Sequence, residues 1–351
     1  MTAEVLRREP PLPEAPADES SRGLAERVFR IRESGIVVVL VLFVAVTAGL
    51  QHRFLSASNV QFVLVNTVIF ALLALGETMV VVARHVDLSV GSVLGMSAYL
   101  SASLFGSHPG IPVPVVFLVG LGIGLGWGIV NGLLVAAGRV PSLVVTLATL
   151  YIIRGVDILI VGGGMVTANT LPASFTGIPK STLLGIPDLA IAVAVVVAAG
   201  AYYLRSFRSG RELYAIGSNP EAARLTGLPI GKRVLFAFAV SGAIAGVAGV
   251  LWAAQYGTVD STAGTGYELT VITAVVVGGV AIFGGSGSVV GAALGALLLA
   301  TINSALYVLG VSDFWDQAIF GFLLILAITI DRIISVKLTA ALRLRSTRRG
   351  T

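Results

Sequence analysis

Long runs of apolar residues alternate with short polar segments along this chain of 351 residues. A membrane-spanning helix needs roughly 20 apolar residues, and about ten runs meet or approach that length. They lie at residues 33–51, 60–82, 88–105, 113–136, 142–161, 186–204, 234–255, 268–283, 288–309 and 316–334. The runs lack the strict alternation of polar and apolar residues that is typical of a transmembrane β-barrel. The pattern predicts an all-α, polytopic membrane protein with about ten transmembrane helices.

The composition supports this class, since 56% of the residues are hydrophobic and only 12% are charged. The distribution of the 23 Lys and Arg residues predicts the orientation, because basic residues are retained on the cytoplasmic side. With the N-terminus inside, the outer segments keep only Arg53 and Lys180, and Arg154 falls within a span. Both termini are therefore expected in the cytoplasm. The net charge of +5 reflects this topology, so we expect no nucleic-acid partner.

The same pattern divides the chain into a central membrane domain and two tails. Residues 1–32 are rich in Pro, Glu, Ser and Arg, and we expect a disordered cytoplasmic tail. Residues 33–336 are expected to form one transmembrane domain with a basic cytoplasmic loop at 205–233, and residues 337–351 a basic cytoplasmic tail.

Glycines recur at every fourth position in several of the predicted spans. Small residues at this spacing let helix backbones approach closely in lipid. We therefore expect helix contacts along Gly120, Gly124, Gly128 and Gly132, along Gly242 and Gly246, and along Gly287, Gly291 and Gly295.

A short helix is predicted inside the cytoplasmic loop, in the stretch SNPEAARLTG at 218–227. Ser218 or Asn219 can cap it, Pro220 suits its first turn, and Gly227 favours its end. A helix of about two turns is marginal by itself in water. It must therefore pack on the rest of its own loop or on another protein.

The sequence EAARLTG resembles the EAA loop of the import permeases of ATP-binding-cassette (ABC) transporters. The resemblance extends over nearly the whole chain after residue 55, to the branch that serves ribose, xylose, rhamnose and related carbohydrates. It is carried by DLSVGSVLG at 87–95, by residues 131–155, by GRELYAIGSNPEAARLTG at 210–227 and by residues 262–279. In that family the loop helix couples to an ATPase, which implies a coupling site at Asn219, Pro220, Glu221, Ala222, Ala223, Arg224, Leu225 and Gly227.

The resemblance implies the permease subunit of an ATP-driven, binding-protein-dependent importer of a monosaccharide, of rhamnose or pentose type, in the bacterial inner membrane. The expected partners are a cytoplasmic ATPase that binds ATP and magnesium, a second permease copy or a sister permease, and an extracytoplasmic sugar-binding protein. We expect no enzymatic activity, catalytic residue, cofactor or metal site in this chain. The segment GLPIGKR at 227–233 is one residue too short for a phosphate-binding loop, and Arg233 replaces its Ser or Thr.

Three alternatives remain open at this point. The same importer class could carry autoinducer-2 or nucleosides. An ion-coupled secondary transporter could bind a proton or cation at Glu77, Asp87 or Asp157. A membrane interaction protein would have no transport role.

Polar residues in and beside the predicted spans are candidates for the transport path, because intramembrane polar groups need partners. Arg84, Asp87 and Ser89 are candidates for an inner gate, although Asp87 could instead cap a helix beginning at Leu88. Arg154 and Asp157, three residues apart, are expected to neutralise one another, with substrate contact as the alternative. The candidate path residues are Asn66, Glu77, Asn131 and Asn303.

Overall fold

The computed structural model describes residues 33–312 and 315–329. The predicted tails at 1–32 and 337–351 lie outside the described residues, as does the end of the last predicted span. The apolar helices are α2 Ser34–Leu50, α3 Ala57–Val82, α4 Val90–Ser107, α5 Val113–Ala136, α6 Ser142–Val161, α8 Asp188–Ser206, α11 Ile230–Tyr256, α12 Tyr267–Val277, α13 Val289–Val308 and a helix at Trp315–Thr329.

Short elements connect these helices. Helices α9 Arg208–Ser218 and α10 Pro220–Leu225 lie in the predicted cytoplasmic loop, and α7 Ala173–Thr176 lies between α6 and α8. Three 3-10 turns occupy His52–Leu55, Ala168–Thr170 and Ile178–Lys180. Strands β1 Thr182–Leu183 and β2 Ile186–Pro187 form a small antiparallel hairpin. The described chain is thus mainly helical with very little sheet, which confirms the predicted all-α class.

Each of the ten predicted spans coincides with a helix. Seven of these, α3, α4, α5, α6, α8, α11 and α13, are long and apolar enough to cross a membrane. α12 ends at Val277, although the apolar pattern predicted a span to residue 283. Gly279 has φ +86, and the chain turns there instead of continuing the helix. A helix of 11 residues is about 17 Å long, too short to cross a hydrocarbon core of about 30 Å.

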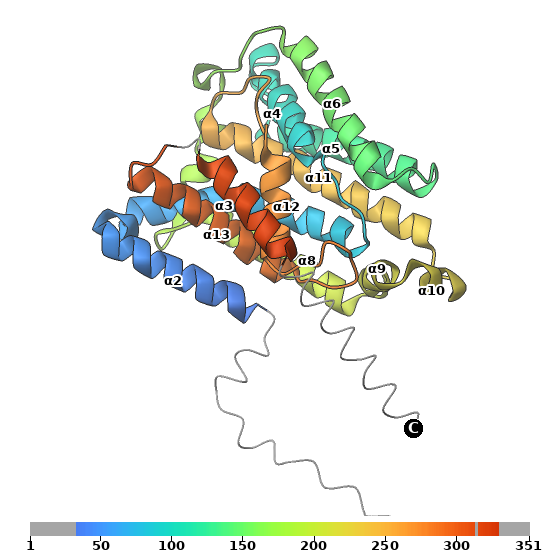
Figure 1. The fold of residues 1–351 in the computed structure, drawn as a ribbon. Coiled ribbons are helices and arrows are strands. Elements are labelled where there is room, and N and C mark those ends of the chain that lie inside the picture. The colour runs from blue at the N-terminus through green and yellow to red at the C-terminus, as the bar shows by residue number, and fades with distance from the viewer. Residues whose placement is uncertain (1–32, 313–314, 330–351) are drawn as a thin grey trace, which may run out of the picture.

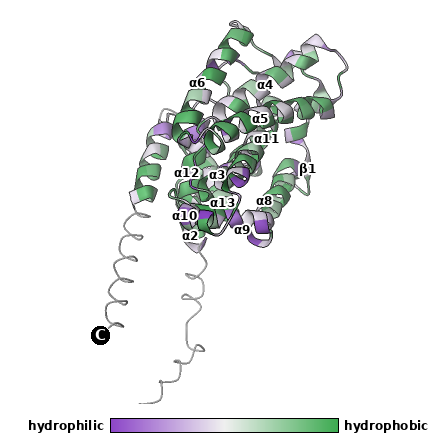
Figure 2. Cartoon of the chain, turned by 90° about the vertical axis from the view of Figure 1, so that its right-hand side faces the viewer, coloured by the Kyte–Doolittle hydropathy of each residue, from purple (hydrophilic) through white to green (hydrophobic). Residues whose placement is uncertain are grey.

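The centre of the bundle is built around α3 and α11, which carry many of the buried apolar side chains (Figure 1). α5, α6 and α8 leave most of their residues on the outside of the chain. Figure 2 shows the long helices mostly in the hydrophobic colour, with hydrophilic residues gathered at α9 and α10. A helical bundle with an apolar exterior is typical of a protein whose solvent is lipid.

Glycines join α5 to α11 as the fourfold spacing predicted. A Cβ added at Gly124 would meet the carbonyl oxygen of Gly242, and one at Gly246 would meet that of Gly120. The backbones of the two helices are therefore in direct contact. α13 contacts the end of α12 in the same way, since a Cβ at Gly295 would meet the carbonyl oxygen of Ala274.

Candidate functional site

The loop between α8 and α11 contains the predicted short helix, α10. Its N-cap is Asn219, whose side-chain oxygen accepts a hydrogen bond of 3.0 Å from the backbone N–H of Ala222. Pro220 occupies the first turn, and Gly227 lies just beyond the helix at φ +75, a conformation that glycine adopts readily. The local sequence therefore determines both ends of α10.

The side chains of α10 divide into an inward and an outward set. Ala223 is 4% exposed and faces its own chain. Leu225 is 89% exposed, and Glu221, Ala222 and Arg224 are exposed beside it. Packing within the described chain therefore accounts for Ala223 but not for Leu225.

A buried carboxylate holds α9 against the start of α11. Glu212 accepts a hydrogen bond of 2.8 Å from Arg208 and one of 2.5 Å from Arg233, and its side chain is only 7% exposed. The hydrogen bond from Arg233 is the main reason that the pKa of Glu212 lies below its ordinary value. Tyr214 adds a second attachment, since its hydroxyl donates to the carbonyl oxygen of Gly287, next to α13.

α9 also packs directly against the end of α3. A Cβ added at Gly217 would overlap the carbonyl oxygen of Val82 and approach the backbone nitrogen of Gly285. That nitrogen donates a hydrogen bond of 2.9 Å to the same Val82 carbonyl. The α9–α10 unit is therefore attached to both α3 and the turn that precedes α13.

Four of the predicted polar residues meet in one buried network, which we call the carboxylate network: Glu77, Asp87, Ser89 and Asn131. Glu77 accepts from the backbone N–H of Asp87 at 3.0 Å. Asp87 accepts from the Ser89 hydroxyl at 2.6 Å, and that hydroxyl accepts from the Asn131 amide at 2.8 Å. All four residues are 1% exposed or less. Glu77 and Asn131, predicted to line a path, thus contact the candidate gate residues Asp87 and Ser89 in the buried interior of the bundle.

The predicted cap at Asp87 differs in detail from the structure. α4 begins at Val90, with Ser89 as its N-cap, two residues later than expected. Asp87 accepts from the backbone N–H of Ser89 at 2.9 Å and closes an Asx-type turn ahead of the helix. Burial raises the pKa of Asp87 to about 6, against the opposing effect of the Ser89 hydrogen bonds. Arg84 lies outside the network, exposed and at φ +70.

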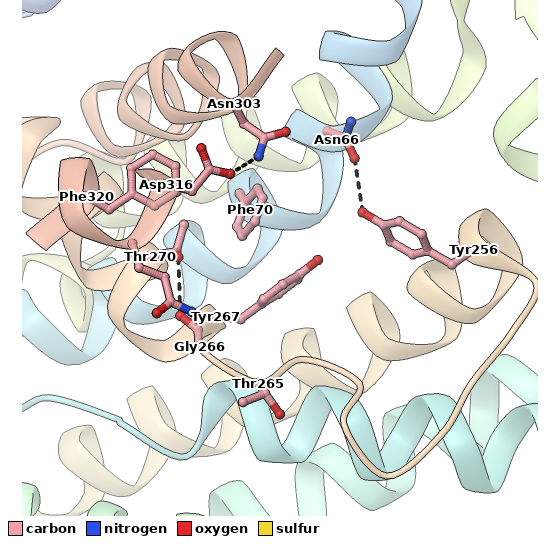
Figure 3. Close-up of a pocket in the computed structure, with 12 residues that line it drawn as sticks. Asn66, Phe70, Tyr256, Thr265, Gly266, Tyr267, Thr270, Asn303, Asp316 and Phe320 are labelled. Carbon is pink, nitrogen blue, oxygen red and sulfur yellow. Dashed lines mark hydrogen bonds between the residues drawn. The ribbon is translucent and has the colours of Figure 1, made fainter. Parts of the chain in front are cut away.

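The other two predicted path residues, Asn66 and Asn303, line a cavity of about 250 Å³, which we call the polar cavity (Figure 3). Asn66 accepts hydrogen bonds from Gln255 at 2.9 Å and from the hydroxyl of Tyr256 at 3.2 Å. Asn303 donates to the carboxylate of Asp316. The cavity is formed by α3, α11, α12, α13 and the helix Trp315–Thr329, together with the turn before α12.

Several lining residues of the polar cavity were not among the predicted site residues. Aromatic rings face it, and those of Phe70 and Tyr267 lie 4.8 Å apart. Asp316 was also missed, although a carboxylate at the start of an apolar run is a signal that needs a partner. The remaining missed lining residues are Tyr256, Thr265, Gly266, Thr270, Ala300, Gln317 and Phe320.

The predicted pairing of Arg154 with Asp157 is not formed as an ion pair. Arg154 instead donates to the backbone carbonyl of Ala263 at 2.6 Å and to that of Ser261 at 3.4 Å. Both carboxylate oxygens of Asp157 lack a hydrogen-bond partner among the described residues. The long Arg154 side chain reaches the turn before α12, where carbonyl oxygens converge, so α6 is fastened to that turn.

The side chains described above can bind a small polar ligand through hydrogen bonds. The described residues contain no group of three His, Asp or Glu residues that could hold a metal ion. The polar cavity supplies amides, hydroxyls, one carboxylate and aromatic faces, which together can accept and donate hydrogen bonds to a small polar ligand.

Comparison with known proteins gives consistent matches along the chain. The family model described as "Branched-chain amino acid transport system / permease component" matches residues 59–328. The ribose import permease protein RbsC of Escherichia coli K12 is 33% identical over 316 residues, covering 89% of this chain and 97% of that protein. The autoinducer 2 import system permease protein LsrC of Enterobacter sp. strain 638 is 35% identical over 298 residues, covering 85% of each.

The ribose import permease RbsC of Haemophilus influenzae is similar as well, at 32% identity over 302 residues, which cover 86% of this chain and 93% of that protein. No solved structure gives a significant match. The helices from α3 onward, the loop and the polar cavity lie within or overlap the matched residues 59–328, whereas α2 precedes them. The chain therefore belongs to this family of membrane transport permeases, the permease components of import systems.

Proposed function

We propose that this chain is the membrane-spanning subunit of an ATP-driven, binding-protein-dependent importer of a monosaccharide, of rhamnose or pentose type. The polar cavity carries the proposal, because its amides, hydroxyls and aromatic rings match the hydroxyl groups and apolar faces of a sugar. The name of the ribose import permease supports a pentose. The name of the autoinducer 2 permease keeps that molecule as the second candidate substrate.

The energy for transport is proposed to come from a separate ATPase that binds the outward side of α10. Leu225 is the proposed anchor, with Glu221 as its polar neighbour. The attachments of α9 to α3 and to the turn before α13 support this role, because force on α10 would reach both helices. ATP and magnesium are assigned to that partner.

The polar cavity is proposed to open and close as two permease subunits, identical or sister chains, alternate their access. Asn66 on α3 and Asn303 on α13 are the proposed sugar contacts. Glu77, Asp87, Ser89 and Asn131 are proposed to keep the inner end of the path closed, since they form a continuous hydrogen-bonded group between α3, α4 and α5. An extracytoplasmic receptor would deliver the sugar from the other side.

The test is uptake of labelled pentoses and rhamnose by vesicles that contain the permease, its ATPase and its receptor. Asn66→Ala and Asn303→Ala should each lower uptake about threefold to tenfold, as expected for the loss of a hydrogen bond worth about 0.5–1.5 kcal/mol. Gln61→Ala, on the same helix as Asn66 but outside the cavity, should keep normal uptake.

Dependence on ATP separates this proposal from ion-coupled transport. Uptake should stop when ATP is removed and should continue when the proton gradient is collapsed. The opposite pattern would favour a secondary transporter, with Glu77, Asp87 or Asp157 as the ion site. Unchanged uptake in both asparagine variants would exclude the polar cavity as the sugar path.

A further inference from the structure

A second cavity, of about 620 Å³, lies between the turn that joins α5 to α6 and the turn that joins α10 to α11. We call it the basic cavity. None of its lining residues lines the polar cavity. Its polar lining residues are His85, Arg139 and Arg224.

The charge of this cavity is positive and unbalanced. Arg139 and Arg224 are both exposed, and neither side chain forms an ion pair with a described residue. Among the described residues, no Asp or Glu lines the cavity. Burial lowers the pKa of His85 to about 4, so that ring is neutral at pH 7 and the two guanidinium groups set the charge. Two guanidinium groups without a counter-charge among the described lining residues favour an anion, and guanidinium groups bind phosphate or carboxylate in a bidentate manner.

The wall beneath the two arginines is apolar. It consists of Val135 and Ala136 at the end of α5, Val140 and Pro141 before α6, and Ile230 at the start of α11. The apolar helix α5 ends beside the cavity, and the apolar helices α6 and α11 begin beside it. The cavity therefore lies at the boundary between lipid and water.

The outer surface next to the cavity continues this apolar wall. Leu133 and Leu134 of α5 are 47% and 43% exposed, and Leu143 and Val144 of α6 are 54% and 59% exposed. An amphiphile could therefore place its charged head on the arginines and its hydrocarbon chain along α5 and α6.

We infer that the basic cavity binds the phosphate head group of an anionic phospholipid, with Arg139 and Arg224 on the phosphate and an acyl chain along the apolar wall. Basic pockets between membrane helices on the cytoplasmic side are suited to such head groups. Because Arg224 belongs to α10 and Arg139 to the α5–α6 turn, the bound lipid links the loop helix to the bundle.

The test uses the purified full-length chain and native mass spectrometry. Phosphatidylglycerol and phosphatidylcholine with the same acyl chains are added, and the fraction of protein that retains each lipid is measured. The Arg139→Gln, Arg224→Gln double variant should retain phosphatidylglycerol about tenfold less, with phosphatidylcholine unchanged. Lys232→Gln, a matched exposed cation that does not line the cavity, should retain it as the unmodified chain does. Undiminished retention in the double variant would overturn the inference.

A second variant separates a lipid from free phosphate. A Cβ at Gly231 would lie 3.8 Å from the Ala136 carbonyl oxygen, an ordinary contact, so Gly231→Leu fills the apolar wall and leaves both arginines in place. It should lose phosphatidylglycerol. Retention of the lipid by this variant would mean that the apolar wall does not hold an acyl chain, which would overturn that part of the inference. Binding of inorganic phosphate as tight as that of the lipid would show that the site takes the free anion instead.

Discussion

Gly124 on α5 leaves no room for a methyl group against α11. Its missing side chain lets the backbone lie against Gly242 and Gly246, whereas Gly122 and Gly126 on the same helix have nothing within 4 Å of an added Cβ. The glycines of α5 therefore have two different roles. Those at the fourfold spacing are packing contacts, and the alternate ones are exposed positions at which a side chain is tolerated.

Gly124→Ala should destabilise the protein by about 1–3 kcal/mol, because the added methyl group overpacks a backbone contact. Gly122→Ala is the matched control and should be neutral or slightly stabilising, since alanine is the better helix former. The measurement is equilibrium unfolding of each variant in detergent. Equal stability of the two variants would mean that α5 and α11 do not pack through Gly124.

At the scale of the elements, the α9–α10 unit combines a fixed inner side with a free outer side. Glu212, Tyr214 and Gly217 attach α9 to its own chain, whereas Leu225 projects from α10. A short helix gains its stability from packing rather than from its own hydrogen bonds. The inner attachments therefore keep α10 in position before any partner binds.

The anchor on α10 can be tested by binding of the partner ATPase. Leu225→Ala should weaken association about tenfold or more, because burying a leucine contributes about 1.5–3 kcal/mol. Leu184→Ala is the matched control, since this leucine is 96% exposed in the β1–β2 turn. Both variants should keep the stability of the unmodified permease. If Leu225→Ala and Leu184→Ala bind the ATPase equally well, α10 is not the docking element.

The attachment by Glu212 predicts a pH dependence. Because the pKa of Glu212 is lowered in the folded chain, chiefly by the Arg233 hydrogen bond, its stabilisation is present above the unfolded pKa of about 4.5. It is lost as the pH falls through the lower folded value. Glu212→Gln should loosen the loop at pH 7 and abolish this acid transition.

A label on the loop can follow that change. The chain has no cysteine, so a fluorophore on a Leu225→Cys substitution reports the motion of α10 alone. Glu221→Gln is the control, because Glu221 is exposed and has no ion pair with a described residue. An acid transition that persists in Glu212→Gln would have to come from another group.

At the scale of the whole molecule, two helices connect the loop to the polar cavity. α3 contacts α9 at Val82 and lines the polar cavity with Asn66 and Phe70. α13 follows the turn that Tyr214 and Gly285 hold, and it lines the cavity with Asn303. Movement of α9 would therefore displace two walls of the cavity together.

Gly217→Ala should weaken the mechanical connection between the α9–α10 unit and the polar cavity. Its methyl group would overlap the Val82 carbonyl and force α9 away from α3. Uptake driven by ATP should fall about fivefold or more, the lower range of typical coupling energies, while the ATPase still binds. Ala215→Ser, an exposed position on the same helix, should transport normally. Normal uptake by Gly217→Ala would place the mechanical connection elsewhere.

The sequence by itself determined the all-α class, the positions of the apolar helices, the caps of α10 and the glycine faces. Each of these depends on local spacing: the length of an apolar run, a residue at a helix end, or a repeat on one helix face. Three local predictions were wrong. α4 begins at Val90 instead of Leu88, and Gly287 precedes α13 instead of lying on one of its faces. Apolar residues 278–283 form a turn instead of continuing α12, because hydropathy alone does not distinguish a turn from a span.

Only the tertiary structure decided which polar groups meet. Asn66 is joined to Gln255 across 189 residues of sequence, and Asn131 contacts Ser89 rather than the polar cavity. Arg154 reaches the Ala263 carbonyl instead of Asp157. In a bundle of helices, a polar side chain finds its partner through the rotation and depth of neighbouring helices. Those are set by packing along the whole helix, and no local pattern records them.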